Sequence, residues 1–228
     1  MTTALVDGDI VAYRCAAASE REDLEVALFR TNDLMDRIIH ETGSDSYQVF
    51  LTGSNNFRYN YNPEYKANRK DTVRPQWLQQ VREHLVVNWK ATVEDEQEAD
   101  DALGIYQMAN KDTIICSIDK DLLMIPGEHY DFVKGIRRDQ FTIPAIRHFY
   151  YQLIMGDRTD NIFGFDGKAR QSVPKFLEPV LAELSSYDDE LDMFSFVRGL
   201  YNDDDRLLMN GICLWIRRNE EEIWKFPS

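Results

Sequence analysis

Short apolar runs alternate along the chain with longer amphipathic stretches. Apolar runs at residues 3–6, 47–51 and 113–117 are typical of buried strands. The intervening stretches predict helices over residues 11–18, from Leu24 to a stop at Gly43, from Pro75, and over residues 97–108. Ser19 and Glu22 have the spacing of a capping box for the second of these helices. This alternation predicts an α/β domain with a central, largely parallel sheet flanked by helices.

From Pro144 onward the pattern is mainly helical, and a last short strand is predicted at IWKF, residues 223–226. We therefore expect an α/β domain over residues 1–143 and a helical part over residues 144–228, packed as one compact unit. No internal repeat or low-complexity linker separates the two parts.

Composition narrows the class of protein. No apolar run approaches the roughly 18 residues of a membrane span, and the first residues do not form a secretory signal, so we expect a cytoplasmic protein without membrane contact. The three cysteines are odd in number and far apart, and the four histidines have no ligand spacing. A disulfide framework and a zinc site are therefore not expected.

A formal net charge of −14 argues, taken alone, against nucleic acid as a partner. The segment from residue 58 to 74 reverses this inference, because basic side chains there are interleaved with aromatic ones, a mixture that suits phosphate contact and base stacking. Its basic residues are Arg58, Lys66, Arg69, Lys70 and Arg74. Its aromatic residues are Tyr59, Tyr61 and Tyr65, and Phe57 comes directly before the segment. A solvated loop with aromatic anchors remains an alternative.

Eight carboxylates lie in four short stretches. They are Asp7, then Glu98, Asp100 and Asp101, then Asp119 and Asp121, and finally Asp157 and Asp160. Asp7 and Asp119 follow predicted strands, and ligands of open α/β sheets collect at the carboxyl ends of the strands. Crowded carboxylates need protons or cations between them, and hard divalent ions prefer oxygen ligands. The sequence therefore predicts a Mg²⁺ or Mn²⁺ site.

The motifs VDGD, YKANR, EADD, SIDKD and GDRTDN occur in an order that resembles the 5′ nuclease family of flap endonucleases and 5′-to-3′ exonucleases. YNPEYKANRK and the closing EIWKFP are most similar to exonucleases of podovirus-type phages. The resemblance implies a PIN-like sheet with a helical arch or loop over the catalytic site in residues 1–143. It also implies a helix-three-turn-helix-like segment that grips duplex DNA in residues 144–228.

The resemblance also assigns residues. It implies that all eight carboxylates are metal ligands for two Mg²⁺ ions, with Mn²⁺ as a substitute, and that Lys66 and Arg69 are catalytic. Tyr65 matches an aromatic that could stack on a terminal base, and Arg58 and Lys70 are further expected DNA contacts. Gly164, Gly167 and Lys168 match part of a hairpin that presents backbone N–H groups to a phosphate, and a potassium ion at that hairpin is left open.

The implied activity is two-metal hydrolysis of phosphodiester bonds at 5′ ends, nicks or flaps of DNA, by a monomer, in phage replication, recombination or primer removal in the host cytoplasm. Cleavage of RNA in RNA–DNA hybrids is left open. One departure is Gly53, which stands where many relatives have an acid after the second strand, and we expect weaker or more water-rich metal binding there. The second departure is the partly kept hairpin after Asp160.

Two other hypotheses fit parts of the sequence. In a haloacid-dehalogenase-type phosphatase, Asp7 and Asp9 would be nucleophile and acid, but EADD, SIDKD and YKANR would have no role. In the second hypothesis, this chain is a DNA-binding protein of the same fold that has lost its turnover through Gly53.

Overall fold

The computed structural model describes residues 1–70 and 72–228. A six-stranded sheet in the order β3-β2-β1-β4-β5-β6 forms its centre, with β5 and β6 antiparallel and the other neighbouring pairs parallel. The strands are β1 (Thr3–Asp7), β2 (Ser46–Thr52), β3 (Thr92–Glu94), β4 (Thr113–Cys116), β5 (Gly127–Asp131) and β6 (Ile136–Gln140). This agrees with the predicted PIN-like α/β fold.

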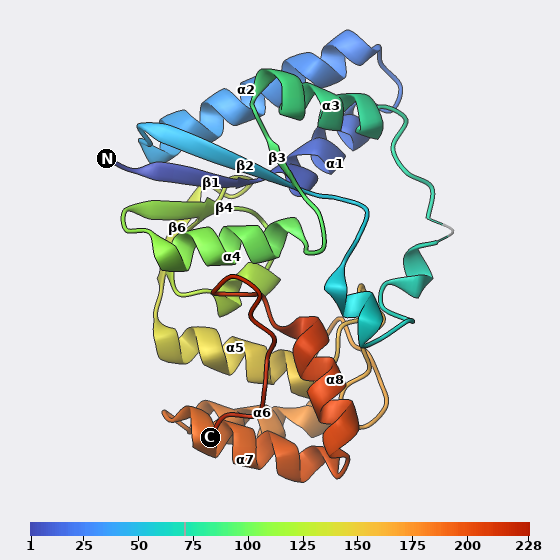
Figure 1. The fold of residues 1–228 in the computed structure, drawn as a ribbon, viewed down its shortest axis with the longest axis vertical. Coiled ribbons are helices and arrows are strands. Elements are labelled where there is room, and N and C mark those ends of the chain that lie inside the picture. The colour runs from blue at the N-terminus through green and yellow to red at the C-terminus, as the bar shows by residue number, and fades with distance from the viewer. Residues whose placement is uncertain (71) are drawn as a thin grey trace.

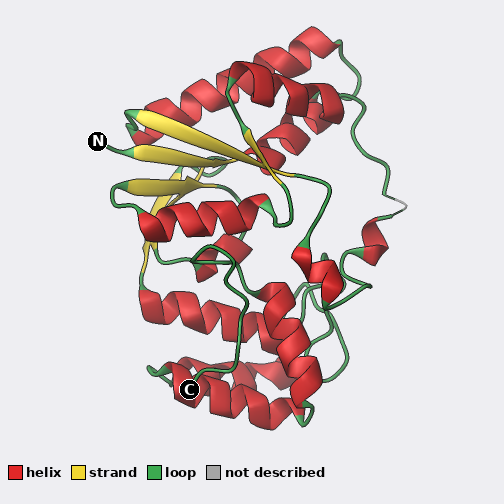
Figure 2. Cartoon of the chain, in the orientation of Figure 1, coloured by secondary structure: helices red, strands yellow, loops and turns green. Residues whose placement is uncertain are grey.

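Helices cover both faces of the sheet (Figures 1 and 2). They are α1 (Gly8–Ala18), α2 (Leu24–Thr42), α3 (Leu78–Asn88), α4 (Ala99–Ala109), α5 (Thr142–Met155), α6 (Glu178–Ser185), α7 (Glu190–Tyr201) and α8 (Asp204–Leu214). Helices α1, α2 and α3 lie on one side of the sheet, whereas α4 lies on the other side and is followed by the layer of α5 to α8. Within the described residues, no helix combines the length and apolar character needed to cross a membrane.

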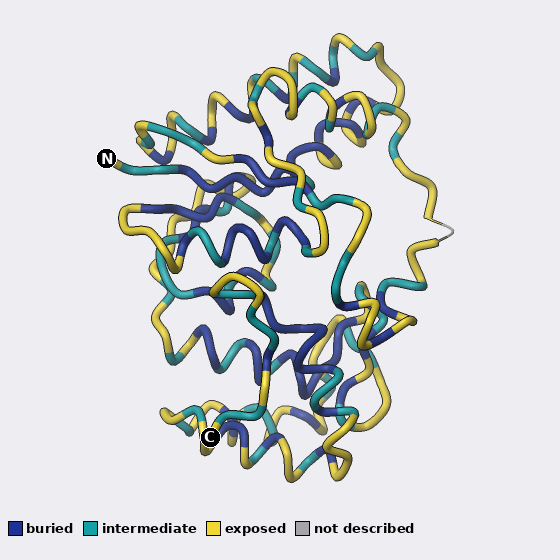
Figure 3. The backbone as a smooth tube through the Cα atoms, in the orientation of Figure 1, coloured by how far each residue is buried: buried dark blue, intermediate teal, exposed yellow. Residues whose placement is uncertain are grey.

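Strand β1 shows how the sheet divides the core. Successive side chains of a strand point to opposite faces, so Ala4 and Val6 pack with α1, α2 and α3, and Leu5 packs with α4 and α5. These three side chains have no exposed surface. Figure 3 shows the resulting buried band through the centre of the molecule. A strand buried on both faces reads as a continuous apolar run, which is why TALV was recognisable in the sequence.

Several predicted boundaries differ from the observed ones. Gly43 ends α2 in the left-handed conformation as predicted, with φ 64°. The predicted capping box is wrong, because Ser19 caps the end of α1 and its hydroxyl accepts a hydrogen bond from Arg30. The predicted strand at residues 223–226 is also wrong: this segment is coil, and Trp224 packs against Gly211 of α8. The β5–β6 hairpin was not predicted.

The helical part is joined closely to the sheet. One hydrophobic cluster contains Leu5 and Ile115 of the sheet together with Phe149, Val197 and Trp215 of the helical part. The expected boundary at 143/144 falls inside α5, and the division into two parts stays a prediction.

Candidate active site

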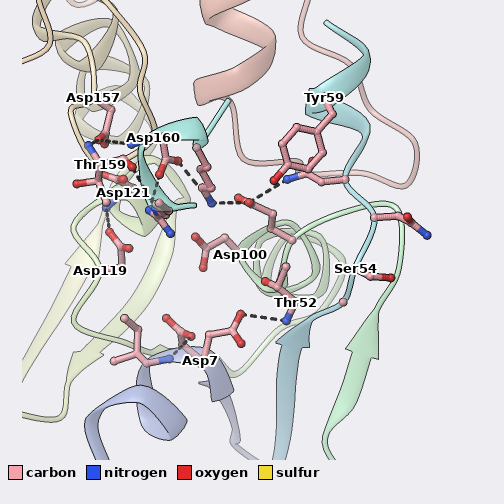
Figure 4. A pocket seen from close by; sticks show the side chains of 18 of the residues that line it. Asp7, Thr52, Ser54, Tyr59, Asp100, Asp119, Asp121, Asp157, Thr159 and Asp160 are labelled. Atoms are coloured by element: carbon pink, nitrogen blue, oxygen red, sulfur yellow. Dashed lines mark hydrogen bonds and ion pairs between the residues drawn. The ribbon is translucent and has the colours of Figure 1, made fainter. Parts of the chain in front are cut away.

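The carboxyl ends of β1 and β4 are neighbours at the point where the strand order reverses, which is where open α/β sheets bind ligands. Asp7 ends β1, and Asp119 follows β4. A pocket of about 500 Å³ opens there. The acidic pocket, as we call it, is lined by the carboxylates of Asp7, Asp9, Glu98, Asp100, Asp119, Asp121, Asp157 and Asp160 and by the basic residues Lys66, Arg69, Lys70, Arg74 and Lys120. Figure 4 shows Asp100 between Asp7 and the group around Asp119 and Asp160.

A chain of hydrogen bonds connects three of the acids. The hydroxyl of Ser117 donates to Asp7 Oδ2 at 2.7 Å, and it accepts the backbone N–H of Asp119 at 3.0 Å. Asp119 Oδ1 in turn accepts the N–H of Asp121 at 2.9 Å. Ser117 was not among the predicted site residues, although its position between β4 and Asp119 is visible in the sequence. It fixes the β4 loop relative to β1.

The stretch after α5 supplies the acids from the opposite wall. Asp157 Oδ1 accepts the backbone N–H groups of Thr159 and Asp160, at 2.6 and 3.1 Å, which closes a tight turn. Asp157 and Ile162 exchange backbone hydrogen bonds at 2.8 Å in each direction. The turn holds Asp157 and Asp160 on the pocket side, although these residues form no helix.

Like charges crowd this pocket. Burial raises the pKa of Asp7 to about 7 and that of Asp121 to about 8, and neighbouring carboxylates add to both shifts. Burial, with Asp7 and Asp119 nearby, also raises the pKa of Asp100 well above its usual value. Burial, with Asp160 and Asp157 nearby, raises the pKa of Asp119. A bound cation is the natural relief for such repulsion.

Asp101 lies outside the acidic pocket. Its side chain is fully buried and forms a bidentate ion pair with Arg58, at 2.6 and 2.8 Å, and it also accepts the N–H groups of Glu98 and Arg217. Burial alone would raise the pKa of Asp101, but the Arg58 charge outweighs it and the pKa is lowered. The prediction that Asp101 is a metal ligand is corrected here, because all its acceptor positions are directed to these partners.

Arg58 requires the same correction. Its side chain is 2 % exposed, and besides Asp101 it binds the carbonyl oxygens of Cys213 and Trp215, at 2.9 and 2.7 Å. It therefore cannot contact DNA as predicted. We call Arg58, Asp101 and these two carbonyls the Arg58 clamp. The clamp ties the start of the basic-aromatic segment to α4 and to the end of α8.

Tyr65 and Lys66 also point inward. The Tyr65 ring is 2 % exposed, with its hydroxyl 3.1 Å from Glu98 Oε2 and 2.9 Å from Asp160 Oδ2, so the expected stacking on a base is not available in this conformation. The Lys66 ammonium pairs with Glu98 and lies 3.6 Å from Asp160. Burial lowers the pKa of Lys66, but these carboxylates outweigh burial and the net pKa is raised.

Residues 64–69, which we call the docked loop, are fastened to the turn at 157–161. The backbone N–H of Lys66 donates to the Asp160 carbonyl at 3.0 Å. The Arg69 side chain donates to the Thr159 carbonyl at 3.0 Å and to the Asp160 carboxylate at 2.6 Å. Asn68 and Asn161 add one bond each. Lys66 has the left-handed backbone conformation, with φ 55°, a strain that such fastening can hold. The docked loop thus places the positively charged side chains of Lys66 and Arg69 over the carboxylates of the acidic pocket.

Steric crowding explains why position 53 is a glycine. A Cβ at this position would lie 2.4 Å from the Glu94 carbonyl oxygen and 2.7 Å from Asp95 Oδ1, so an acid does not fit without displacing β3. Asp9, absent from the predicted ligand set, lines the same wall and accepts the N–H of Thr52 at 3.0 Å. Its other oxygen pairs with Arg82 of α3. Asp9 therefore supplies a carboxylate to this wall of the pocket, although position 53 carries no acid.

The hairpin after Asp160 differs from its predicted role. The N–H of Gly164 donates to the Lys168 carbonyl at 2.9 Å, and that of Gly167 donates to the Gly164 carbonyl at 3.0 Å. Both groups are used within the turn and are not directed to a phosphate, which corrects the prediction for Gly164 and Gly167. Gly164 is required by close packing, since a Cβ would lie 2.3 Å from the Ile154 carbonyl oxygen. Lys168 lines a separate cationic hollow together with Arg158 and Arg170.

The donors of the acidic pocket fit a hard divalent cation. They are carboxylate oxygens, with raised pKa values at Asp7, Asp100, Asp119 and Asp121. Among the residues described, no three His, Cys, Asp or Glu side chains are yet drawn together closely enough to hold an ion. The Lys66 ammonium offsets part of this negative charge, because it pairs with Glu98 and lies close to Asp160. Binding of a cation therefore requires side-chain adjustment.

Comparisons with known proteins agree with this geometry. The family model described as 5'-3' exonuclease, N-terminal resolvase-like domain, matches residues 2–151. One similar solved structure is the bacteriophage T5 flap endonuclease in a pseudo-enzyme–product complex with DNA and metal ions, with a TM-score of 0.70 and 16% identity, covering 94% of this chain and 89% of that chain. Another is the bacteriophage T5 5'-exonuclease with zinc, with a TM-score of 0.69 and 17% identity over the same shares. The resemblance and the fold predicted from the motifs are confirmed.

Proposed function

Because the chain belongs to the 5′-3′ exonuclease family, we propose that it is a divalent-metal-dependent 5′ nuclease, with Mg²⁺ as its ion and Mn²⁺ as a substitute. Its proposed reaction is hydrolysis of phosphodiester bonds at 5′ ends, nicks or flaps of DNA. The observation that carries the proposal is the acidic pocket at the strand-order reversal, with the cations of the docked loop set against it.

The metal ligands are proposed to be the carboxylates that line the pocket. They are Asp7, Glu98, Asp100, Asp119, Asp121, Asp157 and Asp160, with Asp9 as a further candidate. Two divalent cations, when bound, supply activation of water and stabilisation of the leaving oxygen at the phosphodiester. The protein contributes the fixed positions of these acids through Ser117 and the turn at Asp157.

The docked loop supplies phosphate contacts. Lys66 acts as a point charge on a phosphate, and the planar guanidinium of Arg69 can hold one with two parallel hydrogen bonds. Both now pair with Glu98 or Asp160, so cations in the pocket would free them for the substrate. Lys70 and Arg74 line the same pocket and are proposed to extend this contact along the strand.

Duplex DNA is proposed as the partner. The bacteriophage T5 relative was solved with DNA and metal ions. On this chain, Lys168 and Arg158 line a hollow of about 380 Å³ in the segment after α5, suited to a duplex phosphate, whereas Arg170 in the same hollow is paired with Asp166. A role in phage replication, recombination or primer removal, action on RNA–DNA hybrids and a monomeric state belong to the same proposal. A potassium ion at the hairpin gains no support from the observed turn.

The test is cleavage of 5′-labelled DNA by the purified protein, using a duplex end, a nick and a 5′ flap, with Mg²⁺, with Mn²⁺ and with a chelator. We expect release of 5′ nucleotides or short oligonucleotides with either metal and none with the chelator. Binding of flap DNA without cleavage under any condition would contradict the proposal and favour a DNA-binding protein that has lost turnover. The phosphatase alternative has no support once the family is known.

A further inference from the structure

Helix α5 carries a buried glutamine, Gln152, beside the acidic pocket. It is 3 % exposed, and its side-chain amide donates to Asp121 Oδ1 at 2.5 Å. For the ionised Asp121 that would bind a metal, the donor assignment is the favourable one, because the opposite amide orientation would place a carbonyl oxygen against a carboxylate oxygen. Gln152 thus reaches Asp121 from an element that contributes no other side chain to this acid's hydrogen bonding among the described residues.

The other half of this amide is unusual. Gln152 Oε1 is buried and has no hydrogen-bond partner among the described residues. An unpaired buried acceptor is costly, and it is normally removed by a partner, a water or an apolar replacement. The hydrogen bond to Asp121 is therefore the contact that the Gln152 amide makes among the described residues.

A second buried glutamine in the chain provides the contrast. Gln107 of α4 is 6 % exposed, and both ends of its amide are paired. Its nitrogen donates to the Glu128 carbonyl at 3.0 Å, and its oxygen accepts the Thr113 hydroxyl at 3.0 Å. Gln107 joins α4 to the strands β4 and β5, and its partners do not line the acidic pocket. Gln107 is a structural glutamine, whereas the side chain of Gln152 has, among the described residues, one partner, Asp121 of the acidic pocket.

We propose that Gln152 is a positioning residue that holds the Asp121 carboxylate toward Asp119 and Asp157 for a shared divalent cation. The inference rests on the proposed function, because it takes Asp121 as a metal ligand. Asp121 lies among like charges and would otherwise turn away from them, and a single amide donor can hold its orientation without adding a charge that competes with the metal.

The experiment compares Gln152→Met with Gln107→Met. Methionine has a similar length and helix propensity, so each change removes the amide and little else. The readouts are Mn²⁺ affinity, measured by titration with Mn²⁺ alone, the melting temperature of the metal-free protein, and kcat and KM on a 5′ flap. For Gln152→Met we expect a loss of 10-fold or more in Mn²⁺ affinity, a lower kcat, and a melting temperature that is not lowered. For Gln107→Met we expect a lower melting temperature and Mn²⁺ affinity within about twofold of the wild type.

Gln152→Asn is the second variant. It keeps the amide but is one methylene too short to reach Asp121, so it should show the same loss of Mn²⁺ affinity. Unchanged affinity in both Gln152 variants, or equal losses in Gln152→Met and Gln107→Met, would overturn the proposal. A wild-type protein that fails to cut DNA but whose Mn²⁺ affinity depends on Gln152 would sink the proposed nuclease and leave this inference standing.

Discussion

Asp100 and Asp101 are neighbours in the first turn of α4, but they belong to opposite electrostatic regions. Asp100 enters the acidic pocket, where burial and like charges raise its pKa. Asp101 enters the Arg58 clamp, where a guanidinium lowers its pKa despite complete burial. One region is balanced within the protein, and the other needs a charge from outside. The contrast shows that burial of an acid says little about its role until its partners are known.

Within this turn, we therefore expect Asp101 to act mainly on stability and Asp100 mainly on function. The clamp is satisfied internally, so removing one member leaves an uncompensated charge. The acidic pocket is unsatisfied internally, so removing one member relieves repulsion and removes a ligand at the same time. Opposite responses of stability to mutation are the sharpest way to test this division.

The largest effect on stability is expected in the clamp. Arg58→Met leaves Asp101 buried without its partner, which should lower the free energy of unfolding by about 3–5 kcal/mol and the melting temperature by roughly 10 °C. Chemical denaturation measures the first and a thermal scan the second. Arg198→Met, which breaks an exposed pair with Asp204, is the control and should change little. Equal losses in the two variants would show that the clamp does not stabilise the fold.

Next in size is the effect of Asp119→Asn on cleavage. Asparagine keeps an oxygen that can accept the Asp121 N–H, but it removes a ligand charge. Cleavage should fall about 100-fold or more, beyond the loss typical of a supporting residue, whereas DNA binding should persist. The metal-free protein should melt no lower than the wild type, because a like charge is gone. Asp188→Asn is the control, because Asp188 is exposed and lies outside the acidic pocket. Cleavage by Asp119→Asn near the wild-type rate would contradict the assignment.

The last test is the pH dependence of the metal-free protein. Asp7 and Asp121 have pKa values of about 7 and about 8 in the folded state, above those of the unfolded chain. They bind protons more tightly when folded, so their stabilisation is complete at low pH and is lost as the pH rises through these values. The melting temperature should therefore fall between about pH 5 and pH 8.

Mg²⁺ should reverse this fall. At a concentration 100 times its Kd, it should add about 2.7 kcal/mol, with a larger rise in melting temperature at pH 8 than at pH 5. Thermal scans with and without Mg²⁺ at the two values measure both effects. Asp119→Asn should flatten the pH dependence of the metal-free protein. A melting temperature that rises from pH 5 to pH 8 without metal would refute the crowding argument.

The strands and the acids that follow them were predictable because their causes are local. TALV and TIIC are apolar on both faces, and parallel strands bring their carboxyl ends to one edge, so Asp7 and Asp119 were placed correctly beside each other. These inferences need only the period of the pattern and the direction of the strands.

Asp101 and Arg58 were not predictable because their partners are distant. Glu98 and Asp101 do share a helical turn, but the Asp101 carboxylate meets an arginine 43 positions away in the chain. The basic-aromatic pattern around Arg58 looks the same whether its guanidinium faces DNA or a buried carboxylate. Asp9 was hidden by a different cause, since its place beside the pocket depends on the close approach of Thr52. Tertiary contacts of this kind have no local signature.

The Arg58 clamp also makes the position of the docked loop depend on the far end of the chain. Arg58 binds acceptors at residues 101, 213 and 215, so the segment that leads to Lys66 is held by contacts with residues that come much later in the sequence. Contacts so distant in sequence raise the contact order of the fold. We therefore expect a chain truncated before Cys213 to leave Arg58 without two of its acceptors and the loop that carries Lys66 less firmly held.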